Sequence, residues 1–149
     1  MEKLIVSGHT VGEANYHIVL VPAYRRDIFV SKIIQELTIY YIFQKLQQLR
    51  VNILSSEFGP DHLHLFVSNV RFVSEVELVR QIKGYSSFMM RREYWDLFRD
   101  KLWGDKFWTY GHFFRSVGEV NKETIRKYIE ESQSKHWGEI EQKTLASFS

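Results

Sequence analysis

The sequence contains no cysteine among its 149 residues. Disulfide bonds, thiol catalysis and cysteine-based zinc sites are therefore excluded, and the composition suits a reducing compartment without requiring one. The N-terminal segment lacks the apolar core of a signal peptide, and no apolar run approaches the length of a membrane span. We therefore expect a soluble, cytoplasmic protein without a membrane partner.

Internal repeats and low-complexity tracts are also missing from the sequence. The length suits one domain over residues 1–149, with a core at 14–137 and a C-terminal tail at about 138–149. The chain is 44% hydrophobic and 15% aromatic, which is enough for a packed core. A net charge of +2 is compatible with nucleic-acid binding but does not establish it.

Hydrophobic periodicity predicts four strands, at residues 16–26, 51–57, 62–68 and 107–117. Helices are expected at 31–50, from Ser74 to about residue 94, and from Asn121 onward. The order β-α-β-β-α-β-α predicts an α+β, ferredoxin-like (RRM-like) fold. In this fold two helices cover one face of a four-stranded antiparallel sheet, and the additional C-terminal helix carries Tyr128. The other sheet face is expected to be open for function.

Two histidines lie in the segment GPDHLHLFV, at His62 and His64. Side chains alternate across a strand, so the two imidazoles are expected on one face and Leu63, Leu65 and Val67 in the core. As neutral imidazoles at i and i+2, the pair can chelate one divalent ion. The alternative is that both histidines are simply packed or solvated on a half-exposed face.

Tyr128 lies in the segment NKETIRKYIEESQ. It is either a half-buried residue of an amphipathic helix or a nucleophile. A phenol has a pKa of about 10 and attacks poorly at neutral pH, so a nucleophilic tyrosine needs a nearby metal ion to activate it. Glu131 and Ser132 lie beside it at i+3 and i+4, whereas Gln133 at i+5 points elsewhere in an ideal helix.

Four stretches in order resemble the single-tyrosine HUH transposases that small insertion sequences of the IS-two-hundred class encode. They are YHIVLVPAYRRDIF, GPDHLHLFVS, QIKGYSSFMMRRE and FWTYGHFFRSVGEVNKETIRKYIEESQ. The resemblance implies a DNA transposase that holds Mg²⁺ or Mn²⁺ through His62 and His64. Tyr128 would attack single-stranded DNA, form a 5′-phosphotyrosine link and free a 3′-OH, so that rejoining needs no ATP.

The resemblance also implies a third metal ligand from the tyrosine helix. The family's glutamine usually stands four residues after the tyrosine, where this chain has Ser132. We assign the ligand to Gln133, one residue further on, with Glu131, Ser132 and Asp61 as the alternatives.

The implied partners are a DNA hairpin at each end of the element and a second copy of the chain. In the homodimer, the tyrosine helix can be swapped between subunits. Candidate DNA-binding residues are Arg25, Arg26, Lys83, Arg91 and Arg92, and candidate base-stacking residues are Phe107, Trp108, Tyr110, Phe113 and Phe114. Many of these charges are equally typical of a solvated helix face, and the aromatics of a core.

Three other functions stay open. The main alternative is a non-catalytic module that binds single-stranded nucleic acid on the same ferredoxin-like sheet. A zinc hydrolase would need three firm protein ligands, and a two-histidine phosphodiesterase would need His-x-Thr/Ser repeats that the chain lacks. A transposase that has been recruited by its host would keep every motif.

Overall fold

The computed structural model describes residues 15–102 and 106–131. The strands are β1 (Asn15–Pro22), β2 (Asn52–Gly59), β3 (His62–Ser68) and β4 (Trp108–Val117). The helices are α1 (Lys32–Gln48), α2 (Glu75–Phe98) and α3 (Lys122–Glu131), and two short 3₁₀ turns, Ala23–Arg25 and Ile28–Val30, join β1 to α1.

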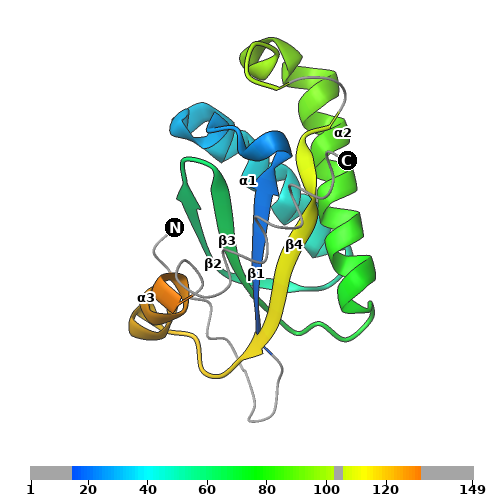
Figure 1. The fold of residues 1–149 in the computed structure, drawn as a ribbon. Coiled ribbons are helices and arrows are strands. Elements are labelled where there is room, and N and C mark those ends of the chain that lie inside the picture. The colour runs from blue at the N-terminus through cyan, green and yellow to red at the C-terminus, as the bar shows by residue number, and fades with distance from the viewer. Residues whose placement is uncertain (1–14, 103–105, 132–149) are drawn as a thin grey trace.

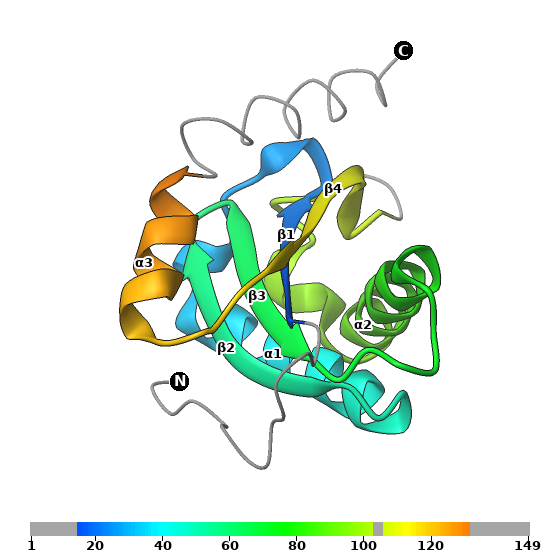
Figure 2. The ribbon, with the colours of Figure 1, turned by 90° about the horizontal axis from the view of Figure 1, so that it is seen from below.

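The strands form one antiparallel sheet in the order β2-β3-β1-β4. Helices α1 and α2 pack against each other, and α3 lies apart from them beside β2 (Figures 1 and 2). The predicted α+β, ferredoxin-like sheet with two helices on one face and a third helix at the C-terminal side is confirmed. β1 and β3 occupy the centre of the sheet, and β2 and β4 its edges.

The main core lies between the sheet and the pair α1 and α2. Each strand of this core contributes alternate residues, because successive side chains point to opposite faces. The fully buried members include Ile18, Leu20, Leu63 and Leu65 from the sheet and Ile42, Leu46, Leu78 and Ile82 from the helices. This apolar layer supplies most of the burial that stabilises the fold.

Two predicted boundaries are wrong. The first strand ends at Pro22 rather than residue 26, because Tyr24 and Arg25 have left-handed backbone φ values of 59° and 53° and so leave the sheet. Helix α2 continues past a kink at Tyr94 and ends at Phe98, rather than at about residue 94. Gly84 does not interrupt the helix.

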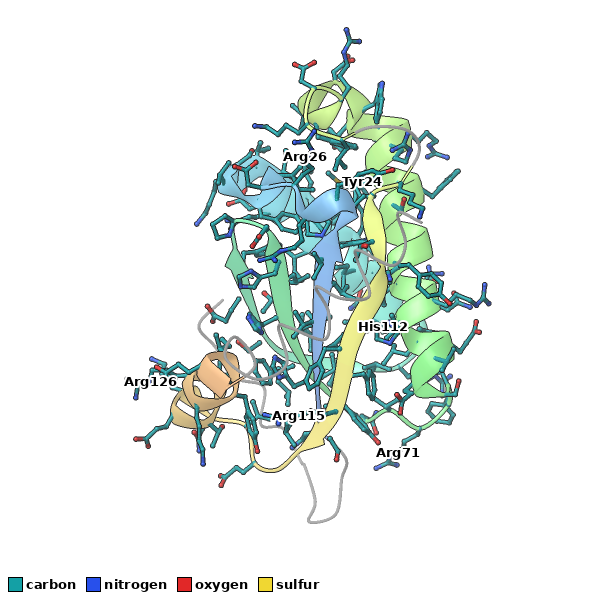
Figure 3. All side chains as sticks on the ribbon, viewed as in Figure 1. Tyr24, Arg26, Arg71, His112, Arg115 and Arg126 are labelled. Carbon is teal, nitrogen blue, oxygen red and sulfur yellow. The ribbon has the colours of Figure 1, made fainter. Side chains whose placement is uncertain are left out.

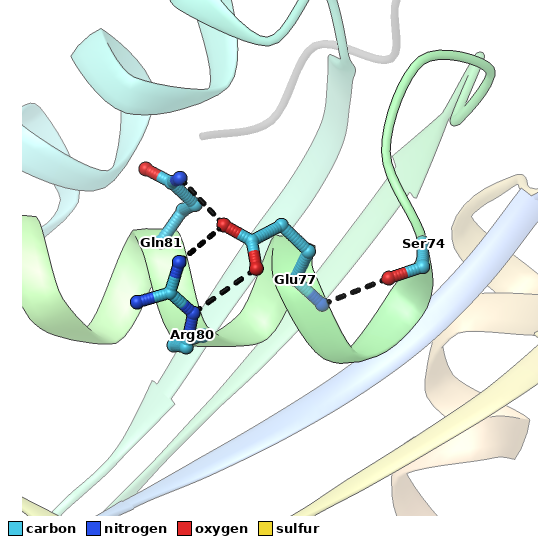
Figure 4. Close-up of polar contacts among 4 residues, drawn as sticks. All are labelled: Ser74, Glu77, Arg80 and Gln81. Carbon is cyan, nitrogen blue, oxygen red and sulfur yellow. Dashed lines mark hydrogen bonds and ion pairs between the residues drawn. The ribbon is translucent and has the colours of Figure 1, made fainter.

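The capping box of α2 is present as predicted. The Ser74 side chain accepts a hydrogen bond of 3.1 Å from the Glu77 backbone N–H (Figure 4). The Glu77 carboxylate in turn accepts hydrogen bonds from Arg80 and Gln81 (Figure 4). Among the described residues, no helix combines the length and the apolar character that crossing a membrane demands.

Candidate active site

The two histidines of β3 project from the sheet face opposite α1 and α2. Leu63 and Leu65 belong to the main core, and alternation along the strand puts His62 and His64 on the other face together with Phe66. We call this the histidine face. His62 is 8% exposed and His64 is 1% exposed, so the expectation of an open face is wrong.

Helix α3 packs on the histidine face, which explains part of this burial. Ile125 and Ile129 contact Leu54 of β2 and Phe66 of β3 in a small apolar cluster. Tyr128 is packed against the same cluster and is half-buried. The tyrosine and the two histidines therefore lie on one side of the sheet within a single chain.

The start of α3 is held by reciprocal hydrogen bonds. Asn121 Oδ1 accepts from the Thr124 backbone N–H at 2.9 Å, and the Asn121 backbone N–H donates to Thr124 Oγ1 at 2.8 Å. Asn121 is thus the N-cap that the sequence predicts. The cap sets where the helix begins and hence which side of it, including Tyr128, meets the sheet.

Tyr128 is neighboured by side chains from β1 and β4. Its ring centroid is 6.3 Å from that of His17, and the Arg115 guanidinium lies 4.6 Å from the Tyr128 ring centroid. Figure 3 shows Arg115 at the end of β4 that faces α3. An arginine over a tyrosine face is a favourable cation–π contact, which helps to hold the ring in place.

His17, which the sequence analysis did not single out, shares a side-chain hydrogen bond with His64. Its Nε2 lies 2.9 Å from His64 Nδ1 in a buried hydrogen bond. The His17 ring stacks on Phe66 at a centroid distance of 4.5 Å and an interplanar angle of 2°. The signal that could have revealed it was a lone polar residue in an apolar strand that the predicted fold places beside β3.

His64 is held in its neutral form. Burial, and to a lesser extent the neighbouring His17 and His62, lower the pKa of His64 from 6.5 to about 2. Its second ring nitrogen, Nε2, is buried and has no hydrogen-bond partner among the described residues. A neutral imidazole with an unsatisfied nitrogen is the form that binds a metal ion.

His62 is oriented by a different partner. Its Nδ1 lies 3.0 Å from Asp61 Oδ1, and Asp61 Oδ2 lies 3.3 Å from Arg25 Nε. Arg25, predicted to contact DNA, thus lies at the same end of the sheet as His62.

Gly59 is the cross-strand neighbour of His62. A Cβ atom at this position would overlap the His62 imidazole. Only glycine leaves room for the ring at this position, so Gly59 is a further site residue that the sequence analysis did not single out.

Most candidates for the expected third metal ligand have side chains that the structure does not describe. Gln133 and Ser132 fall outside the described residues, and the Glu131 side chain is likewise not described. The oxygens of Asp61 are engaged by His62 and Arg25. Within residues 15–102 and 106–131, no three His, Asp or Glu side chains form a metal site.

Three of the four remaining candidate DNA-binding residues lie on the other side of the sheet from the histidine face. Lys83, Arg91 and Arg92 belong to α2, where Lys83 Nζ donates to the Tyr110 carbonyl at 3.1 Å. Arg91 lies over Trp95, and Arg92 pairs with Glu93. Arg26 follows β1 and lies near the end of the sheet where Tyr24 turns (Figure 3).

A groove of about 810 Å³ runs between α2 and β4. It is lined by Lys83, Lys106 and Tyr110, and Tyr110 is 79% exposed. Burial and the neighbouring Lys106 lower the pKa of Lys83 to about 8.

Three of the candidate stacking aromatics are packed in the core. Phe107 and Trp108 are buried, and the Trp108 Nε1–H donates to Ser86 Oγ at 2.9 Å. Phe114 packs against the same core beside Tyr16. Only Tyr110 in the groove is exposed, while Phe113 contacts the buried valines Val19 and Val21 on the histidine face.

Solved transposase structures share this fold. The structure superposes on a transposase from Deinococcus radiodurans with a TM-score of 0.63 at 23% identity, covering 85% of this chain and 96% of the other. It also superposes on a REP-associated tyrosine transposase bound to a REP hairpin, with a TM-score of 0.54 at 11% identity and coverage of 88% and 74%. At these identities the likeness establishes the fold alone.

Sequence comparison establishes the family. The family "Transposase IS200 like" matches residues 10–132. The transposase of insertion sequence IS200 from Salmonella typhimurium is 32% identical over 122 residues, which are 81% of this chain and 78% of that protein. The ISDra2 transposase TnpA from Deinococcus radiodurans is 28% identical over 125 residues, 84% of this chain and 88% of that protein. The chain therefore belongs to the IS200-like transposases, a family of DNA-processing enzymes.

Proposed function

We propose that this protein cleaves and rejoins single-stranded DNA, with Tyr128 as the nucleophile and a divalent ion held by His62 and His64. The observation that carries the proposal is His64 Nε2, a buried nitrogen without a hydrogen-bond partner among the described residues, on the sheet face where Tyr128 packs. Burying such an atom unsatisfied is costly, and coordination of an ion offsets that cost.

The ion we propose is Mg²⁺ or Mn²⁺, as the family resemblance implies, and neutral imidazoles are common ligands of divalent ions. His62 and His64 supply two ligands, and Gln133 is our first choice for a third, with Glu131, Ser132 and Asp61 as alternatives. When bound, the ion would polarise the phosphate and favour the phenolate. Asp61 is the least suited alternative, because His62 and Arg25 already hold its two oxygens.

The chemistry assigned to Tyr128 is a phosphoryl transfer. The phenol loses its proton, its oxygen bonds to the phosphorus that stays attached to the 5′ oxygen of the downstream nucleotide, and the bond from phosphorus to the 3′ oxygen of the upstream nucleotide breaks. The departing oxygen takes up a proton and becomes a 3′-OH. Attack of a 3′-OH on the phosphotyrosine reverses these steps, so the strand is rejoined without ATP.

We further propose a DNA hairpin as the substrate feature and a homodimer as the assembly. The hairpin is supported by the REP hairpin bound to a transposase of the same fold. The dimer rests on the family resemblance, and β4, an edge strand, offers backbone groups for pairing with a second copy. In the structure α3 packs on the sheet of its own chain, so a swapped arrangement would exchange this contact between subunits.

The decisive experiment incubates the protein with Mn²⁺ and single-stranded DNA from the flanks of its own gene. A covalent protein–DNA adduct on a denaturing gel is expected for the parent and for Tyr40→Phe, a control at an exposed tyrosine on α1. Tyr128→Phe is expected to give no adduct while it still binds the hairpin. An adduct formed by Tyr128→Phe would show that another residue is the nucleophile.

The same experiment tests the alternative of a non-catalytic binding module. Hairpin binding by the parent without any metal-dependent cleavage would favour that module. The buried, neutral His64 favours the enzyme, because a stacking platform for bases needs exposed aromatic side chains instead.

A further inference from the structure

Both histidines of β3 have a partner at Nδ1, and the two partners differ in kind. His62 Nδ1 lies against the Asp61 carboxylate at 3.0 Å, whereas His64 Nδ1 lies against the His17 imidazole at 2.9 Å. Metal-ligating histidines usually donate their other ring N–H to an acceptor of this sort, which fixes the tautomer and the ring orientation.

The hydrogen bond between His17 and His64 carries one proton, which belongs to one ring or the other. If His17 donated, neutral His64 would carry its own proton on Nε2. That N–H would be a buried donor without an acceptor among the described residues, a rare and costly arrangement. If His64 Nδ1–H donates instead, Nε2 keeps a bare lone pair, and the proton of neutral His17 lies on its Nδ1, which is buried as well. Burial therefore does not separate the two arrangements, but only the second leaves His64 Nε2 able to coordinate an ion.

We propose that His17 is a positioning residue that accepts a hydrogen bond from His64 Nδ1–H and so holds the His64 Nε2 lone pair ready for a divalent ion. The inference rests on the proposed function, in which His64 is a metal ligand. Stacking of His17 on the fully buried Phe66 keeps the acceptor in register with His64.

His17 is placed to orient His64 rather than to share its ion. His17 Nε2 contacts the Nδ1 side of the His64 ring. The two nitrogens of the His64 ring, Nδ1 and Nε2, point in divergent directions. An ion at His64 Nε2 would therefore lie on the opposite side of the ring from His17.

Burial explains why one acceptor is neutral and the other charged. His17 is fully buried, so a carboxylate in its place would carry a large desolvation cost. Asp61, whose side chain is 25% exposed, has Arg25 as a counter-ion.

The test compares the parent with His17→Phe, which keeps an aromatic ring on Phe66 but lacks the acceptor, and with His17→Gln, whose amide oxygen replaces it. His112→Phe is the matched control, a histidine substitution on β4 beside the groove. Nitrogen-15 NMR of the metal-free proteins reads which His64 ring nitrogen is protonated, and calorimetry measures Mn²⁺ affinity. Circular dichroism confirms that each variant is folded.

We expect the parent and His112→Phe to show the proton on His64 Nδ1. In His17→Phe that preference should be lost and Mn²⁺ affinity should fall by about 10–100-fold, with most of it recovered in His17→Gln. A proton on His64 Nε2 in the parent would overturn the proposal. So would unchanged Mn²⁺ affinity in His17→Phe, or equal losses in both variants, which would make His17 itself a ligand.

Failure of this inference is distinguishable from failure of the proposed function. The tautomer is read without metal and without DNA, so it tests the positioning role by itself. A parent that binds Mn²⁺ through His64 yet forms no DNA adduct would contradict the proposed cleavage and support the role of His17.

Discussion

The two faces of the sheet bury different kinds of side chain. On the side of α1 and α2, the strands present fully buried apolar residues such as Ile18, Leu63 and Leu65. The histidine face buries His17 and His64 almost as deeply, yet its apolar contact with α3 is small. One face therefore supplies stability, and the other holds polar groups in place at some cost in stability.

The largest expected effect belongs to the histidine face. His64→Gln should reduce Mn²⁺-dependent adduct formation by at least ~100-fold, because the loss of an ion that stabilises transition-state charge costs several kcal/mol. The matched control His112→Gln should cleave like the parent. Adduct formation by His64→Gln at the parental rate would remove His64 from the site.

Leu65→Ala tests the apolar face, one residue further along the same strand. We expect a loss of about 2–5 kcal/mol in the free energy of unfolding, measured by urea denaturation, because a cavity opens in the main core. At low temperature the folded fraction should still form the adduct. A variant as stable as the parent would contradict the placement of Leu65 in the core.

Gly59→Ala probes the contact between the β2 backbone at Gly59 and the His62 ring on the histidine face. The added methyl group meets the His62 ring, and relieving such overpacking typically costs about 1–3 kcal/mol. If the ring swings aside instead, stability is kept and Mn²⁺ affinity falls. Calorimetry together with urea denaturation separates these two responses, and parental values in both would show that the ring does not lie over Gly59. Gly84→Ala, in open space on α2, is the matched control.

The buried His64 should also make the stability of the histidine face depend on pH. The pKa of His64 is about 2 in the folded protein and 6.5 when the ring is freely solvated, so the unfolded chain binds the extra proton between these values. In the metal-free protein the free energy of unfolding should therefore fall as pH drops below 6.5, by up to about 1.4 kcal/mol per pH unit from this group. His64→Gln should show a shallower slope from pH 6.5 to 5, and an identical slope would contradict a neutral, buried His64.

The helix caps give the smallest expected effects. Ser74→Ala on α2 and Asn121→Ala on α3 should each cost about 1 kcal/mol of stability, as N-cap losses typically do. Only Asn121→Ala should also slow adduct formation, since α3 carries Tyr128 toward the histidine face. Equal cleavage by the two variants would mean that α3 needs no cap to place the tyrosine.

Much of the fold could be read from local patterns. The β3 strand, Ser74 and Asn121 are where the sequence predicts them, since alternation and capping depend on neighbours along the chain. The end of β1 was missed because Tyr24 and Arg25 adopt a left-handed backbone with no glycine to signal it.

By itself, the sequence determined the order of the elements, the shared face of His62 and His64, and Tyr128 on a capped terminal helix. All of these follow from spacing along one segment. Only the tertiary structure decided that this face is buried, that His17 of β1 meets His64, and that Asp61 turns to His62 and Arg25. Such contacts join segments far apart in the chain, and their partners depend on how strands and helices pack.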